Sequence, residues 1–175
     1  MFSLQNKIAV VTGGGSGIGK AISALFAKQG AIVHILELTE ESSKIAVDEI
    51  TAEGGKVFAH ACNVANHDAV VATFEKIGAI NILVNNAGIA HIGKADTTPE
   101  ADFDRIMNVN VKGVYNCLYA AIPQFRKSNG GVIVNMASIA AWVGIPDRFA
   151  YSTAKGAVMA MTLSVAKDYL GENIR

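Results

Sequence analysis

Short apolar runs alternate along the chain with longer segments of helical periodicity, and this alternation restricts the possible folds more than any other feature. The short runs are rich in β-branched residues and apolar at successive positions, which predicts strands buried on both faces. Strands of this kind separated by helices form a parallel sheet covered on both sides, so the predicted class is a doubly wound α/β fold. The predicted strands are 7–12, 31–36, 57–61, 80–84 and 132–136, and the predicted helices are 18–28, 40–53, 68–77, 98–125 and 151–170.

The composition narrows the classes of function. The 175 residues are 51% hydrophobic, which suits one domain with one sizeable core. Fifteen basic residues balance 15 acidic ones, so no excess positive charge attracts nucleic acid or an anionic membrane. We find no leader-like N-terminus and no apolar run that could span a bilayer, and we expect a cytoplasmic protein. Cys62 and Cys117 lack metal-ligand spacing, so we expect two reduced thiols and no metal site.

A glycine-rich turn separates the first predicted strand from the first predicted helix. Residues 12–19 read TGGGSGIG, and the backbone N–H groups that begin the helix are suited to a pyrophosphate. We expect Gly13 to allow a sharp turn, Gly17 to let phosphates approach the backbone, and Gly19 to let the helix pack closely on the strand. Glu37 ends the second strand, where a carboxylate can accept hydrogen bonds from an adenosine ribose. The alternatives are glycines that only shape a loop and a solvated acidic cluster at Glu37.

Four polar residues in the second half of the chain are candidates for the chemistry. Tyr151 and Lys155 are four positions apart on the last predicted helix, so both side chains lie on one face. Ser138 follows the last predicted strand at its carboxyl end, where ligands bind in open parallel sheets. Asn110 interrupts an otherwise apolar helix. Simpler explanations are a chance match for the tyrosine and lysine, a helix cap or loop serine, and a surface position or local helix bend at the asparagine.

Together these motifs resemble the short-chain dehydrogenase/reductase family in its classical form, and the resemblance covers the whole chain. Residues 12–19 match the family's TGxxxGxG turn, and residues 85–88 match its NNAG signature. The catalytic tetrad of the family corresponds to Asn110, Ser138, Tyr151 and Lys155. Two positions differ: Asn63 replaces the usual aspartate that accepts from adenine, and Asn81 replaces an aspartate that often opens the fourth strand. An asparagine oxygen still accepts a hydrogen bond.

The resemblance implies an oxidoreductase that transfers a hydride between a nicotinamide cofactor and a secondary alcohol or ketone. Tyr151 would be the acid or base, and the ammonium of Lys155 would favour the phenolate and bind the nicotinamide ribose. Ser138 would hold the substrate oxygen, and Asn110 would position a water that connects Lys155 to solvent. The residues expected to bind the cofactor are Gly13, Ser16, Gly17, Ile18, Gly19, Glu37, Asn63, Val64, Asn86, Ala87, Gly88, Tyr151 and Lys155.

The cofactor and substrate can be specified further. Glu37 should repel a 2′-phosphate, and neither Ser16 nor Leu38 supplies a basic side chain, so we expect NAD rather than NADP. Arg148 lies three residues before the tyrosine of the tetrad, where it could bind a carboxylate through two parallel hydrogen bonds. An arginine lies at the same place in enzymes of the family that act on 3-hydroxybutyrate or deoxy sugar acids, which this segment resembles loosely. We therefore expect a small hydroxy acid or sugar acid as substrate. The alternative is a surface arginine that pairs with Asp147 or another acid, or makes a subunit contact.

The family also sets expectations for the rest of the molecule. Residues 1–175 would form a single NAD(P)-binding Rossmann domain without the family's last strands, so that strand 132–136 has an unpaired edge. The apolar faces of the two long helices, 102–125 and 151–170, predict a homotetramer or homodimer. Two other functions remain open, a Rossmann-like methyltransferase and a catalytically silent dinucleotide sensor.

Overall fold

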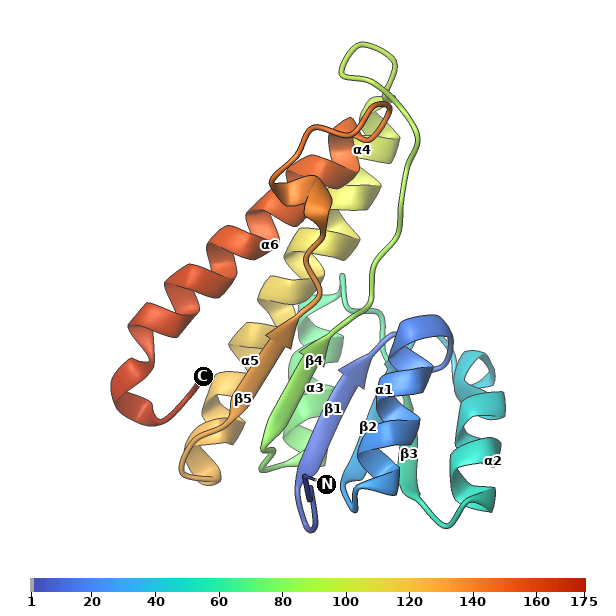
Figure 1. Cartoon of the computed structure of the whole chain (residues 1–175), viewed down its shortest axis with the longest axis vertical. Coiled ribbons are helices and arrows are strands. Elements are labelled where there is room, and N and C mark those ends of the chain that lie inside the picture. The colour runs from blue at the N-terminus through green and yellow to red at the C-terminus, as the bar shows by residue number, and fades with distance from the viewer. Residues whose placement is uncertain (1) are drawn as a thin grey trace.

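The computed structural model describes residues 2–175, which form one five-stranded parallel sheet between two layers of helices (Figure 1). The strands are β1 (Ile8–Thr12), β2 (Ile32–Glu37), β3 (Lys56–Ala61), β4 (Ile82–Asn85) and β5 (Val132–Asn135). Their order is β3-β2-β1-β4-β5, so the chain reverses its direction of travel between β1 and β4. Ligands of open α/β sheets bind at the carboxyl ends of the strands flanking such a point. The predicted doubly wound α/β class is confirmed.

Helices on the two faces of the sheet bury separate cores. The α-helices are α1 (Gly17–Lys28), α2 (Lys44–Ala52), α3 (His67–Ile77), α4 (Glu100–Met107), α5 (Gly113–Lys127) and α6 (Phe149–Asp168). Because successive strand residues point to opposite faces, Val10 packs in the core with α3, α5 and α6, and Val11 in the core with α1 and α2. Both valines are fully buried, which explains why the strands are apolar at successive positions.

Two predicted helices are divided in the structure. The predicted helix 98–125 is α4 and α5 joined by a π-helical segment, Asn108–Lys112. The predicted helix 40–53 begins with a short 3₁₀ helix, Glu41–Ser43, before α2. Single-turn π segments insert one residue into a helix and often occur at functional sites. Sequence periodicity does not resolve such an insertion, since the apolar positions continue on both sides of it.

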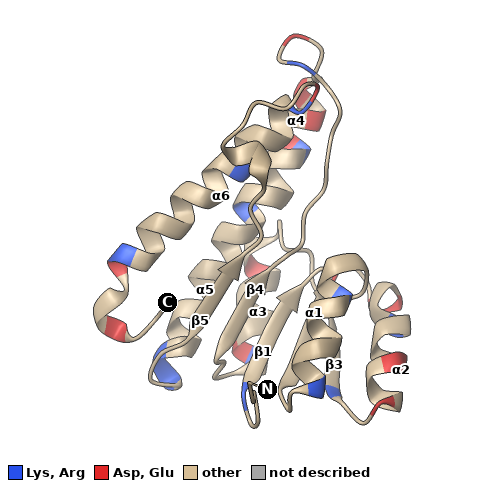
Figure 2. Cartoon of the chain, viewed as in Figure 1, with Lys and Arg blue, Asp and Glu red and all other residues tan. Residues whose placement is uncertain are grey.

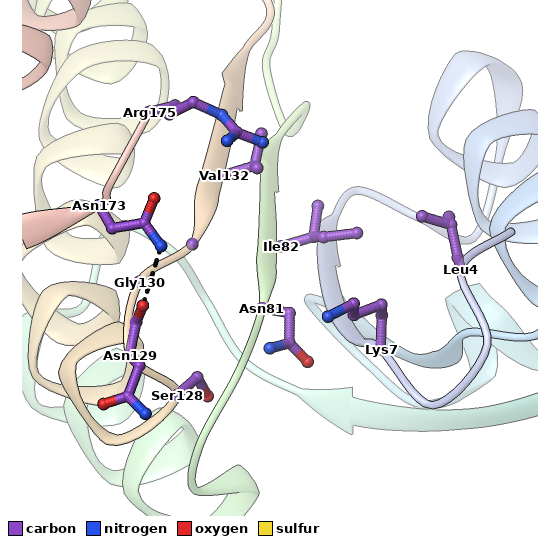
Figure 3. A pocket seen from close by; sticks show the side chains of 11 residues that line it. Leu4, Lys7, Asn81, Ile82, Ser128, Asn129, Gly130, Val132, Asn173 and Arg175 are labelled. Atoms are coloured by element: carbon purple, nitrogen blue, oxygen red, sulfur yellow. Dashed lines mark hydrogen bonds between the residues drawn. The ribbon is translucent and has the colours of Figure 1, made fainter. Parts of the chain in front are cut away.

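The last residues of the chain lie beside β5. The backbone N–H of Gly131 donates to the carbonyl of Asn173 at 3.0 Å, and that of Ile133 donates to the carbonyl of Arg175 at 2.7 Å. The expectation of an unpaired outer edge was therefore wrong for the first half of β5. A cavity of about 290 Å³ lies near this contact, at the amino ends of β1, β4 and β5, and its lining includes Lys7 and Asn81 (Figure 3). The glycine-rich turn lies at the carboxyl ends of the strands, so this cavity at their amino ends is not the candidate site.

The surface carries interspersed charges. Figure 2 shows basic and acidic positions distributed over the ribbon, with both signs on α2. Within residues 2–175, no helix combines the length and the apolar character needed to cross a bilayer.

Candidate active site

The glycine-rich turn has the geometry of an anion cradle. Gly13 adopts a φ of +64°, in the left-handed region that favours glycine, and this conformation turns the chain from β1 toward α1. A Cβ on Gly19 would overlap the carbonyl of Gly13, so close packing requires glycine there. A Cβ on Gly17 would meet nothing within 4 Å, which leaves open space over the start of α1. The first turn of α1 contains no acidic residue to compete with an anion.

Thr12 joins this turn to the NNAG segment, a role that the sequence analysis missed. Its buried Oγ1 accepts from the backbone N–H groups of Asn86 and Ala87, both at 3.0 Å. The Asn86 side chain donates in return to the carbonyls of Thr12 and Gly13 at 3.0 and 3.1 Å. The two glycine-containing segments therefore form one rigid unit across the carboxyl ends of β1 and β4. A threonine among apolar strand residues is the only signal that could have revealed this role.

A cavity of about 240 Å³ beside this unit contains Glu37, the residue expected to bind the adenosine ribose. Its lining residues are Gly13, Ser16, Leu36, Glu37, Leu38, Cys62, Asn63, Val64, Asn86, Ala87, Gly88, Ile89 and Val109. Glu37 Oε1 accepts from the backbone N–H of Gly15 at 3.0 Å, which holds the carboxylate over the turn. Asn63 is exposed, and its Oδ1 accepts from the N–H of Ala65 at 3.0 Å. The fold thus gathers eight of the residues expected to bind the cofactor around one cavity.

A second cavity, also of about 240 Å³, contains the tyrosine and lysine of the tetrad. Its lining residues are Ile18, Asn86, Gly88, Ile89, Ala90, Met136, Ala137, Tyr151 and Lys155. Three residues, Asn86, Gly88 and Ile89, line both cavities, so the two are adjacent. An elongated ligand that occupied both would pass the start of α1, since Ile18 lies on that first turn.

Lys155 is a buried cation without a carboxylate partner among residues 2–175. The residue is only 7% exposed, and its Nζ donates to the carbonyl of Met136 and lies 5.7 Å from the ring centroid of Tyr151. Burial lowers the pKa of Lys155 from the ordinary lysine value. A buried ammonium held this close to Tyr151 places positive charge beside the phenol ring, within the cavity that both residues line.

Ser138 caps a short helix, as the simpler of the two explanations for this serine predicted. It is the N-cap of a 3₁₀ helix, Ile139–Ala141, and its Oγ accepts from the N–H of Ala140 at 3.2 Å. The hydroxyl proton remains available to donate, since the cap uses only the oxygen. Ser138 directly follows Ala137, which lines the cavity, but is itself outside that lining.

Asn110 is a helix-bend residue and not a surface residue. It lies in the π segment, is 1% exposed, and makes two hydrogen bonds of 2.8 Å with the backbone N–H and carbonyl of Ile89. Both ends of the amide are therefore occupied by Ile89. The side chain therefore fixes the backbone between the two cavities, and the expected role of Asn110 in positioning a water stays a prediction.

Arg148 is half-buried at the start of α6 and outside both cavities. Its Nη1 donates to the main-chain carbonyl of Asp147 at 2.9 Å, so the expected alternative of an ion pair with the Asp147 carboxylate is not formed. The segment is attached to the loop after β4, because Gly93 donates to Asp147 at 3.0 Å and accepts from Phe149 at 3.1 Å.

The remaining expectations concern Asn81, the cysteines and metal ions. Asn81 Oδ1 accepts from the N–H of Ile8 at 3.0 Å, so the asparagine supplies an acceptor at the start of β4. Cys62 and Cys117 are free and buried, and burial raises the pKa of both thiols. No group of three or more His, Cys, Asp or Glu side chains within residues 2–175 is arranged to hold a metal ion.

Comparisons with known proteins agree with this geometry. The sequence model of the short chain dehydrogenases matches residues 7–175. The 2-(R)-hydroxypropyl-CoM dehydrogenase of Xanthobacter autotrophicus is 42% identical over 98% of this chain and 72% of its own length. Two solved structures each cover 99% of the chain: an NAD⁺-bound xylitol dehydrogenase (33% identity, TM-score 0.95, 69% of that chain) and a metagenomic short-chain oxidoreductase with NADP (32%, 0.94, 80% of that chain). These matches decide against the methyltransferase alternative. The chain belongs to the classical short-chain dehydrogenase/reductase family, whose members are oxidoreductases that act on alcohols and ketones with nicotinamide cofactors.

Proposed function

We propose that this protein interconverts a secondary alcohol and its ketone, with NAD(H) as the hydride carrier. The observation that carries the proposal is the placement of Tyr151 and Lys155 in a cavity adjacent to the one that Glu37 lines. When bound, the nicotinamide supplies the chemistry of hydride acceptance or donation. The protein supplies binding, orientation and a proton-transfer group.

The residues present fit a dinucleotide. Glu37, Asn63 and Val64 line the cavity for the adenosine half, and Gly17 leaves room for phosphates over the N-terminus of α1. Lys155 lies at the other end, where its ammonium can bind ribose hydroxyls. Acceptor oxygens of Glu37 favour a 2′-hydroxyl and disfavour a 2′-phosphate, which supports NAD over NADP.

Tyr151 is the proposed acid or base. In the oxidative direction its oxygen takes the hydroxyl proton of the substrate, and in the reductive direction it returns that proton to the carbonyl oxygen. The positive charge of Lys155, 5.7 Å from the tyrosine ring centroid, stabilises the negative charge that develops on the tyrosine oxygen during proton transfer. Ser138, with a hydroxyl proton not used by its cap, donates to the substrate oxygen. Asn110 keeps Ile89, and hence the floor shared by both cavities, in place.

Single substitutions test the chemistry. Tyr151→Phe should remove nearly all turnover and leave the dissociation constant for NADH almost unchanged, because only the hydroxyl is lost. Lys155→Ala should damage both turnover and cofactor binding, because the ammonium acts on both. Retention of more than about a tenth of the wild-type kcat by Tyr151→Phe would exclude its role in proton transfer. Tight NADH binding by the wild type with no turnover on any alcohol or ketone would favour the silent sensor instead.

Fluorescence titration with NADH and NADPH tests the cofactor preference. We expect NADH to bind more tightly to the wild type, and Glu37→Ala to reduce the difference by removing the repelling charge. Equal or tighter binding of NADPH to the wild type would show that Glu37 does not select the cofactor.

We propose a small hydroxy acid or sugar acid as substrate, with Arg148 as the group that binds its carboxylate. Support comes from the position of Arg148, which is anchored at the start of the helix that carries Tyr151. Its guanidinium makes one main-chain hydrogen bond and keeps donors available. Arg148→Ala should lose about 2–4 kcal/mol of transition-state stabilisation for the acid and little for its methyl ester, measured as kcat/KM. Equal losses of kcat/KM for the acid and the ester would show that Arg148 does not bind the substrate carboxylate.

We also propose that residues 1–175 behave as one cofactor-binding domain that associates into a homodimer or homotetramer through α5 and α6. A groove of about 450 Å³ between these helices supports this contact, and its apolar lining includes Tyr119, Ile122 and Met161. Light scattering gives the oligomeric state. Tyr119 lines this groove and is 55% exposed, so Tyr119→Glu should shift the protein to monomers, and a monomeric wild type would refute the proposal.

A further inference from the structure

A buried asparagine supports the adenosine cavity from behind. Asn116 lies on α5 with 0% exposure, and its Nδ2 donates to the carbonyl of Val64 at 2.8 Å. Its Oδ1 lies 3.0 Å from Nδ1 of His67, the first residue of α3. One amide therefore connects α5 to the middle of the short loop 62–66, which joins β3 to α3, and to the first residue of α3.

The hydrogen-bond directions in this group are fixed by chemistry. The Val64 carbonyl can only accept, so the NH₂ of Asn116 must face it and the amide oxygen must face His67. His67 Nδ1 is therefore the protonated nitrogen of the ring, and it donates to Asn116. The ring also packs against Tyr119 on α5, with the ring centroids 4.8 Å apart. This packing holds the imidazole in the orientation that the hydrogen bond requires.

The loop is held at the residues that line the cavity. Val64 is buried and lines the adenosine cavity together with Asn63. A Cβ on Gly113 would lie 2.8 Å from a methyl of Val64, so the backbone of α5 approaches this side chain closely. Asn63 Oδ1 caps the N–H of Ala65 and stabilises the same turn. The position of this wall is thus determined by α5 and not by the loop alone.

We propose that Asn116 and His67 are positioning residues for the adenine end of the cofactor site. The inference rests on the proposed function, since it takes the cavity beside Glu37 as the adenosine subsite. Neither residue lines that cavity, so both act through Val64 and Asn63. Loss of the Asn116 donor leaves the Val64 carbonyl without its partner, so the backbone at Asn63 and Val64 becomes less ordered in the free protein. Ordering this segment when the cofactor binds then costs part of the binding free energy. Affinity for the adenine half should fall, and affinity for the nicotinamide half should not.

Two variants separate this role from general stability. Asn116→Asp keeps the size and the acceptor toward His67 but places an oxygen against the Val64 carbonyl. His67→Phe keeps an aromatic ring against Tyr119 and removes the donor to Asn116. A matched control is Gln124→Leu, which changes another buried polar residue of α5 (3% exposed) whose side chain contacts Lys127 and neither cavity.

The experiment measures dissociation constants of each variant for ADP-ribose and for reduced nicotinamide mononucleotide. We expect ADP-ribose to bind about 10-fold more weakly to Asn116→Asp and about 3-fold more weakly to His67→Phe than to the wild type. The dissociation constants of both variants for reduced nicotinamide mononucleotide should stay at the wild-type value. Gln124→Leu should bind both probes as the wild type does. If Asn116→Asp fails to fold, His67→Phe alone decides the question. Wild-type affinity for ADP-ribose in the folded variants, or equal losses for both probes, would overturn the inference. Failure of the wild type to bind either probe would instead overturn the proposed function.

Discussion

The π segment between α4 and α5 provides a quantitative test of how the two cavities are held together. Asn110→Ala removes both hydrogen bonds to the backbone of Ile89 and leaves its N–H and carbonyl without their partner. Each polar group deprived of its partner costs about 1–3 kcal/mol when buried. Ile89 is only half-buried, so water recovers part of that loss. We expect the free energy of unfolding to fall by about 2–4 kcal/mol.

Urea denaturation measures this change, and the same segment offers a matched control. Asn108 is exposed and lies in the same π segment, so Asn108→Ala should change the free energy of unfolding by less than about 0.5 kcal/mol. Gly88 and Ile89 line both cavities, so Asn110→Ala should also weaken NADH binding, whereas Asn108→Ala should not. Equal stability of the two variants would refute the structural role assigned to Asn110.

Three further outcomes are expected. Burial, and to a lesser degree the nearby His60, lowers the pKa of His34 from 6.5 to about 4. Between these two pH values the unfolded chain binds more protons than the folded chain does. The stabilisation that is present above pH 6.5 is therefore lost as the pH falls toward 4. Solvent screening at this half-buried site limits the decrease in the free energy of unfolding to about 1–2 kcal/mol. Urea denaturation should therefore show that, between pH 6.5 and pH 4, His34→Phe loses about 1–2 kcal/mol less of this free energy than the wild type does. Gly19→Ala should weaken NADH binding at least about 10-fold, because the new methyl group overlaps the phosphate-binding turn. Gly156 occupies an open helical position, so Gly156→Ala should leave NADH binding unchanged and stabilise α6 by up to about 1 kcal/mol. Equal changes in the NADH dissociation constant for the two glycine substitutions would contradict this expectation. Thr12→Val should reduce NADH affinity by freeing two backbone N–H groups, with Thr12→Ser restoring it in the same titration.

Local patterns in the sequence were sufficient for the sheet, its class and the glycine-rich turn. Val10 and Val11 are both buried because helices cover both faces, so the unbroken apolar run identifies a strand of a parallel sheet. Gly13 requires a positive φ, a demand that the residue type itself reveals. Tyr151 and Lys155 are one helical turn apart, so their common face follows from helix geometry.

Contacts between distant segments were beyond reach of such patterns. The burial of Asn110 depends on a π insertion, and periodicity on either side of a single inserted residue looks like that of an ordinary helix. Thr12 and Asn116 act through partners that are 74 and 52 residues away, Asn86 and Val64. Nothing in a local window distinguishes such a side chain from an ordinary polar residue.

The sequence by itself determined the fold class, the family and the residue types that carry the chemistry, because these depend on short-range periodicity and on motifs of fixed spacing. Only the tertiary structure decided how those motifs are supported. Thr12 joins the glycine-rich turn to the NNAG segment, Asn110 fixes Ile89 between the cavities, and Asn116 supports Val64. Each of these residues satisfies backbone groups of a remote loop, and a buried polar group can be paired only by atoms that folding brings within hydrogen-bonding distance.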